Sequence, residues 1–194
     1  MYLKHNGGMV EVISGPMFSG KSEELIRRVN ILGHAQVKTL IVKHSIDNRW
    51  KDMGIMSRNG CCVSAKTFKS SDEIKQHTKK EKYGALVIDE VQFFDDGIVD
   101  LIKALADQGL RIIISGLDRD YLGNPFGNMP QILAIADRVD KQFAICNQCR
   151  KAATMTYRVS DHEDLVVVGD KEYEPRCRKC HIQGMREKRA KKRG

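Results

Sequence analysis

The chain has 194 residues, of which 41% are hydrophobic and 30% charged. This length is enough for one domain with a core of its own, and the composition excludes a disordered or fibrous protein. Nine basic residues and one acidic residue in 176–194 account for the whole net charge of +8, so the rest of the chain is neutral.

Apolar strands alternate with amphipathic helices between residues 10 and 115. Continuous β-branched runs predict the strands, and apolar residues at helical spacing predict the helices. The strands are expected at 10–13, 39–42, 85–88 and 111–115, and the helices at 19–32 and 98–108. The alternation indicates an α/β fold, a doubly wound parallel sheet with helices on both faces.

Two stretches break this alternation. Residues 46–71 are polar and lack periodicity, so we expect a mobile loop there, with Cys61 and Cys62 as small packing residues. After Cys146 we expect a small separate module of ribbon and loop, with one strand at 165–168. The basic tail at 186–194 is expected to be solvated and frayed, with nucleic-acid contact as the weaker alternative.

The first predicted strand and helix are joined by a phosphate-binding motif. The pattern G-x-x-x-x-G-K-S/T is matched by Gly15, Pro16, Met17, Phe18, Ser19, Gly20, Lys21 and Ser22. Between a strand and a helix, the backbone N–H groups of such a loop (a P-loop) wrap phosphates, helped by the positive end of the helix. We expect Lys21 to reach the β- and γ-phosphates of a nucleotide and Ser22 to bind Mg²⁺.

The predicted strand at 85–88 ends in two carboxylates, Asp89 and Glu90. At the carboxyl edge of a strand beside a P-loop, Asp89 is expected to hold Mg²⁺ directly or through water. Glu90, one residue further on, is placed to take a proton from the attacking nucleophile. ATPases and kinases both place a carboxylate here, so the pair leaves open whether the nucleophile is water or a substrate hydroxyl.

The six cysteines occur in a chain without an apolar run that suits a signal peptide or a membrane helix of roughly 18 residues. We therefore expect a cytoplasmic protein, in which cysteines serve metal binding or chemistry more often than disulfides. Cys146-x-x-Cys149 and Cys177-x-x-Cys180 have the spacing of a tetrahedral zinc site, which is structural when it has four protein ligands. His181 is an alternative to Cys180 as the fourth ligand.

A loop at 116–127 follows the strand at 111–115, at the same edge of the sheet, and can line a substrate pocket. The aromatic side chains near this edge that suit stacking on a flat ring are Tyr121, Phe126, Phe93 and Phe94. Aromatic residues beside strands belong to the core about as often, so both roles stay open for them.

Taken together, these motifs resemble the cytosolic thymidine kinase family found in many bacteria and in animal cytosol. The matching segments, in chain order, are 15–22, 47–50, 89–94, 116–127 and the two cysteine pairs. The resemblance runs from Val10 to His181, and five ordered motifs are far more specific than any one of them.

The resemblance implies that ATP and Mg²⁺ are cosubstrates and that Glu90 is the general base acting on the 5′-hydroxyl of deoxythymidine. It places Gln92 with the ATP and Mg²⁺ site and leaves open whether Arg49 or Arg58 contacts phosphate. It implies a lasso-like loop that is held by the zinc module and grips the base through backbone groups. The side chains implied around the nucleoside are Met17, Phe93, Leu117, Tyr121, Phe126, Thr156, Val166, Val167, Val168 and Tyr173.

The sequence thus divides into an ATP-binding kinase domain at 1–145, a zinc-binding lasso module at 146–183 and a basic tail at 184–194. The resemblance further implies a homotetramer that thymidine triphosphate inhibits. Two other interpretations stay open. A P-loop ATPase with a zinc ribbon that binds nucleic acid suits the basic tail but not the neutral body. A nucleotide-binding module without catalysis leaves Glu90 without a role.

Overall fold

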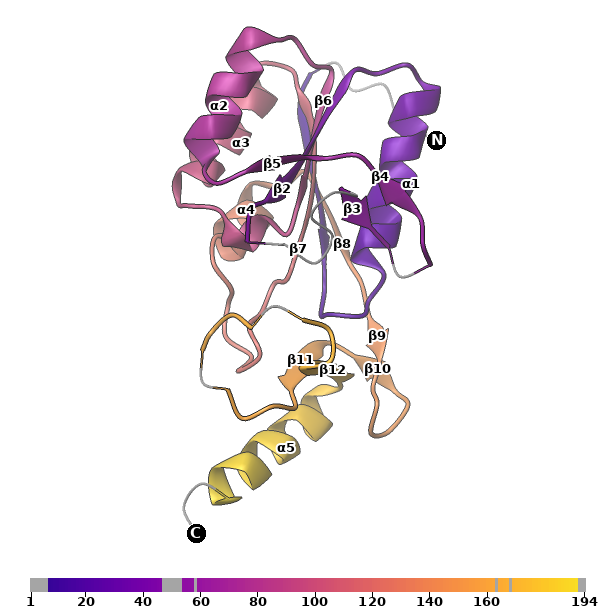
Figure 1. Cartoon of the computed structure of the whole chain (residues 1–194), viewed down its shortest axis with the longest axis vertical. Helices are drawn as coiled ribbons and strands as arrows, with labels where there is room; N and C mark the ends of the chain where they lie inside the picture. Colours follow the sequence, from indigo (N-terminus) through magenta and orange to yellow (C-terminus); the bar gives the residue numbers. More distant parts are fainter. Residues whose placement is uncertain (1–6, 47–53, 58, 163, 168, 192–194) are drawn as a thin grey trace.

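The computed structural model describes residues 7–46, 54–57, 59–162, 164–167 and 169–191, and its body is a six-stranded sheet (Figure 1). All neighbouring strands of this sheet are parallel, in the order β5-β2-β6-β7-β1-β8. In that order they are Lys66–Phe68, Thr39–His44, Ala85–Asp89, Arg111–Gly116, Met9–Ser14 and Arg138–Lys141. The four central strands are those expected from the sequence, which confirms the predicted sheet.

Helices cover both faces of the sheet (Figure 1). One face carries α1 (Lys21–His34), whose Leu25 and Ile26 pack in a buried cluster with residues of β1, β6 and β7. The helices on the other face are α2 (Ser71–Lys80), α3 (Gly97–Asp107) and α4 (Met129–Ile135). The helices predicted at 19–32 and 98–108 are thus confirmed as α1 and α3, and the arrangement is doubly wound.

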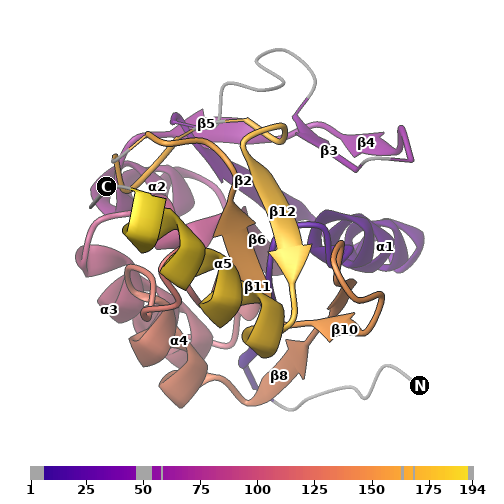
Figure 2. The ribbon, with the colours of Figure 1, turned by 90° about the horizontal axis from the view of Figure 1, so that it is seen from below.

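A small module lies beyond the carboxyl edge of the sheet (Figures 1 and 2). Its strands pair antiparallel in two hairpins, β9 (Ala144–Ile145) with β10 (Ala152–Ala153) and β11 (Met155–Arg158) with β12 (Tyr173–Arg176). Figure 2 shows α5 (Arg178–Lys191) lying across β11 and β12. Gly184 permits this approach, because a Cβ there would lie 2.8 Å from the Tyr157 ring.

The mobile loop expected at 46–71 is corrected by the structure. In its described part, β3 (Ile55–Met56) pairs with β4 (Cys62–Val63), and β5 extends the main sheet beside β2. Short strands of two or three residues carry too little alternation to stand out in a sequence, which explains why they were not predicted. Cys61 and Cys62 are exposed at this hairpin and do not pack in the core.

The strand expected at 165–168 and the frayed tail are also corrected. Leu165, Val166 and Val167 form no strand, since their segment turns backbone groups toward the side chains of Arg158 and Tyr173, and Val168 lies outside the described residues. The tail is helical as far as Lys191, as part of α5. No helix in the described part of the chain is long and apolar enough to cross a membrane.

Candidate functional site

The predicted phosphate-binding loop joins β1 to α1. Gly15 and Gly20 have positive φ values of 144° and 82°, and a Cβ on Gly15 would lie 2.6 Å from the carbonyl oxygen of Gln142, so glycine is required there. Lys21 Nζ donates to the Pro16 carbonyl at 2.8 Å, which holds the ammonium over the loop. Residues 17–22 line a cavity, called here the phosphate cavity, at the positive N-terminus of α1.

Asp89 and Glu90 lie at the end of β6 and both line the phosphate cavity. Asp89 is buried, with 5% of its surface exposed, and accepts a hydrogen bond from the Ser115 hydroxyl of the neighbouring strand β7. Glu90 has a left-handed backbone with φ of 49°, which turns the chain sharply from the strand into the short 3-10 helix η1 (Val91–Phe93). This strained turn brings the two carboxylates to the mouth of the site.

Gln92, expected at the ATP and Mg²⁺ site, lies between Glu90 and the loop that follows β7. Its Nε2 donates to Glu90 Oε2 at 2.6 Å, and its Oε1 accepts from the Leu117 N–H at 3.1 Å. The Leu117 N–H can only donate, so the amide orientation is fixed and the NH₂ group faces the carboxylate. Gly127, with φ of 50°, makes room for this turn, because a Cβ there would lie 2.5 Å from the Gln92 carbonyl oxygen.

A second, largely apolar cavity adjoins the first and is called here the nucleoside cavity. All the side chains implied around the nucleoside line it, except Val168, which lies outside the described residues. Phe93 and Phe126 meet there edge to face, with ring centroids 6.0 Å apart. Phe94 instead packs in the core with 4% exposure, so the core alternative holds for that residue.

The nucleoside cavity also has lining residues that the sequence interpretation did not name. Arg119 and Asp120 lie in the 116–127 loop, of which the sequence points to Leu117, Tyr121 and Phe126. Leu165 and Gly169 belong to the loop between β11 and β12, where the apolar run at 165–168 suggested a strand instead of a loop that lines a cavity. Arg49 and Arg58, the two candidates for phosphate contact, lie outside the described residues.

The two cavities meet at Met17 and Glu90, which line both. Met17 also ties the phosphate-binding loop to the small module, because its N–H donates to Thr156 Oγ1 on β11 at 3.0 Å. A phosphate group in one cavity and a flat apolar molecule in the other would therefore face each other beside the Glu90 carboxylate. Such an arrangement can carry out group transfer between two bound molecules.

The four cysteines of the two pairs converge in the small module. Their Sγ atoms all lie within 4.8 Å of one another, and those of Cys149 and Cys177 are 3.6 Å apart. A tetrahedral ion with Zn–S bonds of about 2.3 Å requires sulfur atoms about 3.8 Å apart, so the cluster fits a four-cysteine metal site. His181 lies aside, since its Nε2 contacts the Tyr121 carbonyl at 2.8 Å, and Cys180 completes the cluster.

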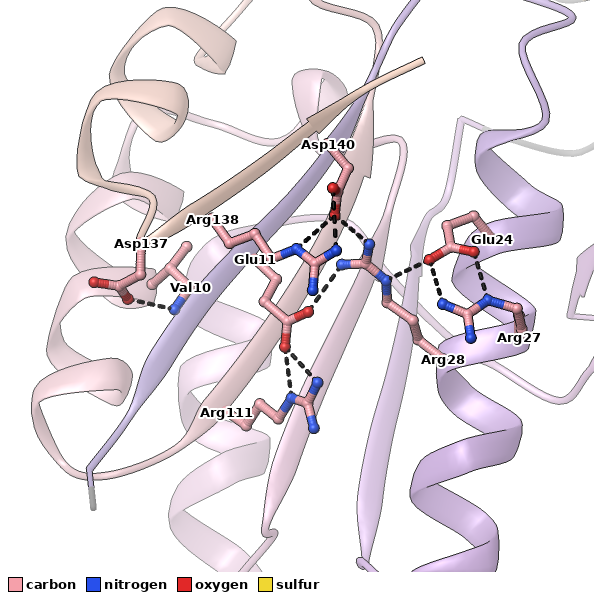
Figure 3. Close-up of polar contacts among 9 residues, drawn as sticks. All are labelled: Val10, Glu11, Glu24, Arg27, Arg28, Arg111, Asp137, Arg138 and Asp140. Carbon is pink, nitrogen blue, oxygen red and sulfur yellow. Dashed lines mark hydrogen bonds and ion pairs between the residues drawn. The ribbon is translucent and has the colours of Figure 1, made fainter. Parts of the chain in front are cut away.

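A buried ion network fixes α1 against the sheet behind the phosphate-binding loop (Figure 3). Arg28 on α1 donates to Glu11 on β1 at 2.9 Å, to Glu24 at 2.8 Å and to Asp140 on β8. Glu11 also pairs with Arg111 on β7 at 2.5 Å. The network thus joins three neighbouring strands to the helix whose N-terminus forms the phosphate cavity.

Comparisons with known proteins agree with this geometry. The family described as "Thymidine kinase" matches residues 8–181. A thymidine kinase of Mycoplasma mobile is 49% identical over 189 residues, covering 97% of this chain and 94% of its own. One of Mesomycoplasma hyopneumoniae is 46% identical over 182 residues, covering 93% of this chain and 99% of its own.

Among solved structures, the genome packaging NTPase B204 from Sulfolobus turreted icosahedral virus 2 is similar at 20% identity, with a TM-score of 0.46. The likeness covers 75% of this chain and 77% of that one, and it is too low to carry an argument about function. The family match spans most of the chain, and the relatives cover nearly all of it at identities near one half. On these grounds the chain belongs to the thymidine kinase family.

Proposed function

We propose that in this thymidine kinase the phosphate cavity holds ATP, the nucleoside cavity holds deoxythymidine, and Glu90 takes the proton of the 5′-hydroxyl. The observation that carries this proposal is that Glu90 lines both cavities. A γ-phosphoryl group in one cavity and a hydroxyl in the other then lie beside a carboxylate, as phosphoryl transfer to a hydroxyl requires.

On the ATP side, the N–H groups of the loop at 15–22 surround the phosphates and Lys21 neutralises part of their charge. Ser22 and Asp89 line the cavity and offer the oxygen ligands that Mg²⁺ prefers. Mg²⁺, when bound, neutralises charge on the β- and γ-phosphates. The Ser115 hydroxyl bonded to Asp89 holds that carboxylate in one orientation.

On the nucleoside side, Met17, Leu117 and Thr156 surround the thymine methyl, and the aromatic side chains pack about the base and sugar. The support is that these three residues line the nucleoside cavity together with Phe93, Phe126 and Tyr173. An apolar pocket with few polar groups suits a flat, weakly polar base. Backbone groups of the loop between β11 and β12 supply the hydrogen bonds that orient the base.

The metal of the cysteine cluster is zinc, and its role is structural. Four thiolates leave no open coordination position, and zinc is the common partner of such a set. The ion ties the β9–β10 hairpin to the start of α5 and so supports a lasso module at 146–183, beside a kinase domain at 1–145 and a basic end at 184–194. Such a reduced thiolate site also suits a cytoplasmic protein.

The enzyme works as a homotetramer that thymidine triphosphate inhibits. Exposed apolar side chains at Val139, Phe143 and Ile145 gather at and just after the edge strand β8, which suits contact with another subunit. Because the two cavities are continuous at Met17 and Glu90, one molecule with a thymine base and a triphosphate can occupy both. Light scattering at low concentration giving a monomer, or inhibition that neither substrate relieves, would contradict these two statements.

The decisive experiment is Glu90→Gln, which keeps the shape of the side chain and removes the base. We expect kcat for thymidine phosphorylation to fall by about 10²- to 10⁴-fold. Binding of ATP should change little, because the loop at 15–22 holds the phosphates. Asp100→Asn, the same carboxylate-to-amide change on the exposed side of α3, serves as the control. If Glu90→Gln stays within a few-fold of wild type, Glu90 is not the base.

A further inference from the structure

The loop between β11 and β12 contributes to the nucleoside cavity without having secondary structure of its own. Leu165, Val166, Val167 and Gly169 from this loop line the cavity. A loop that must present backbone groups in a fixed arrangement needs something to hold it, because free segments lose entropy when they become ordered. At its base the loop is closed by the bond from the Val159 N–H to the Glu172 carbonyl, at 2.9 Å.

The side chain of Arg158 lies at the centre of this loop. It stands at the end of β11 with 1% of its surface exposed. Nη1 donates to the carbonyl oxygens of His162, at 3.3 Å, and Asp164, and Nη2 donates to that of Leu165 at 2.9 Å. Three carbonyl groups of the described loop therefore accept hydrogen bonds from one guanidinium, much as a loop wraps a bound cation.

Tyr173 connects Arg158 to Val167, further along the loop. Nη2 of Arg158 donates to the Tyr173 hydroxyl at 2.6 Å. That hydroxyl donates to the Val167 carbonyl at 3.0 Å and accepts from the Val167 N–H at 3.2 Å. The guanidinium carbon also lies over the ring of Tyr121, 3.7 Å from its centroid. Tyr121, Val167 and Tyr173 all line the nucleoside cavity. Arg158 does not line it, but it is linked to these three residues by direct contact or through the Tyr173 hydroxyl.

The chemistry of Arg158 is specific to this role. Among the described residues its partners are neutral: three carbonyls, the Tyr173 hydroxyl and the rings of Tyr121 and Tyr173, while its buried Nε donates to no described residue. Burying a cation is costly unless hydrogen bonds compensate. Only a planar guanidinium, with several donors in a fixed fork and a face that stacks on a ring, can satisfy all of these contacts together. A lysine would keep the charge and lose the fork.

We infer that Arg158 is a positioning residue for thymidine: it holds the β11–β12 loop in its binding shape before the nucleoside arrives, without touching the nucleoside. The inference rests on the proposed use of the nucleoside cavity. If the loop keeps its binding shape only a tenth of the time, the apparent affinity for thymidine falls about tenfold. The phosphate cavity is lined mainly by the loop at 15–22, by residues 55–57 and by the end of β6, and among the described residues of the β11–β12 loop only Asp170 reaches it. ATP binding should therefore change far less than thymidine binding.

The test compares Arg158→Met and Arg158→Lys with wild type. Both should raise KM for thymidine about tenfold or more, with KM for ATP within twofold and with kcat at saturating thymidine reduced much less than kcat/KM. Hydrogen exchange of the nucleoside-free protein should become faster at 159–172 and stay unchanged in the central strands. Tyr173→Phe removes the hydroxyl link while keeping the ring, and should raise the thymidine KM by a smaller factor.

The double variant distinguishes positioning from general destabilisation. Because Arg158 and Tyr173 act on the same loop, their combined effect on thymidine KM should be smaller than the product of the single effects. Arg176→Met is the matched control. Arg176 ends β12, and its guanidinium lies 3.5 Å from the ring centroid of Tyr157 on β11, but it contacts Glu174 and α5 instead of the loop. It should lower stability without raising thymidine KM.

Two outcomes would overturn the inference. One is a folded Arg158→Lys enzyme with thymidine KM within twofold of wild type. The other is an Arg158→Met protein in which the thymidine and ATP KM values rise together, as expected for general loosening. Either result leaves the proposed reaction intact, since that depends on Glu90→Gln. Full activity of Glu90→Gln would instead remove the catalytic proposal while leaving the loop measurements interpretable.

Discussion

Replacing Arg28 with methionine tests whether the buried ion network holds α1 in place. Arg28 has 2% of its side chain exposed and Glu11 has 1%, so the pair is shielded from water (Figure 3). Methionine preserves most of the apolar stem and removes the guanidinium. Glu11 is then left in the interior with Arg111 as its remaining partner.

The expected magnitude follows from those contacts. Removing one member of a buried ion pair costs about 3–5 kcal/mol when the other charge loses its compensation. Glu11 still accepts a hydrogen bond from Arg111 Nε at 2.6 Å and forms an ion pair with its Nη2 at 2.5 Å, so the lower end applies. We expect a loss of about 3 kcal/mol in unfolding free energy, which corresponds to a melting temperature lower by about 6–12 °C for a chain of this size.

The matched control is the neighbouring Arg27→Met. Arg27 pairs with the same Glu24, but 57% of its side chain is exposed. A pair of that kind contributes about 0–1 kcal/mol. Urea unfolding of both variants, fitted with a common slope, measures the difference between them. If Arg28→Met is destabilised by less than about 1 kcal/mol beyond Arg27→Met, the buried network is not what fixes the helix.

The same network predicts how stability depends on pH. Burial raises the pKa of Asp140, but hydrogen bonds from Arg28 and Arg138 outweigh it and leave that pKa below its usual value. A carboxylate with a lowered folded pKa stabilises the fold above the unfolded pKa, near 4, and this stabilisation is lost as pH falls through the folded value. The stability difference between wild type and Arg28→Met should therefore shrink below a pH of about 4.

Three further predictions concern the rest of the chain. Cys177→Ser should release the metal and loosen the small module, with elemental analysis giving one zinc per wild-type chain; wild-type protein without zinc would contradict this. Gln92→Met should free the base from its amide partner and lower kcat by about 10- to 100-fold with little effect on ATP binding; unchanged kcat would refute it. Deleting 190–194 should leave thymidine KM unchanged, whereas deleting 186–194 should raise it, because Lys188 contacts the Ser160 carbonyl at the base of the loop; equal effects would refute it.

The parts of the fold that follow from periodicity were predictable. Four central strands and two helices carry long apolar patterns, and parallel strands buried on both faces appear as continuous β-branched runs. The edge strands β5 and β8 were not predicted because their sequences are mostly polar and mostly exposed, Arg138–Lys141 in particular. These edge strands join the sheet largely through backbone pairing, which a side-chain pattern does not encode.

In the candidate site, too, one part could be predicted from the sequence pattern and another could not. The phosphate-binding loop and the carboxylates have a motif because their chemistry needs particular side chains at fixed spacing. The nucleoside side was located from the family resemblance, while composition and periodicity gave only an even choice for its aromatic residues. The tail prediction failed because a run of basic residues suggests a solvated end, whereas the tail continues α5, which packs on β11 at Gly184.

Nucleoside affinity should depend more on the backbone shape of the β11–β12 loop than on the side chains within it. If the base is gripped through backbone groups of the β11–β12 loop, side chains within the loop contribute mainly shape, and Val166→Thr should change thymidine KM by only a few-fold. The residue that controls those backbone groups, Arg158, lies outside the cavity it organises. A buried arginine at the end of a strand would ordinarily be assigned to stability. Measuring thymidine KM for Val166→Thr and for Arg158→Lys compares the contribution of a loop side chain with that of the loop backbone. A larger effect for Val166→Thr would show that side chains in the loop, and not its backbone shape, determine nucleoside binding.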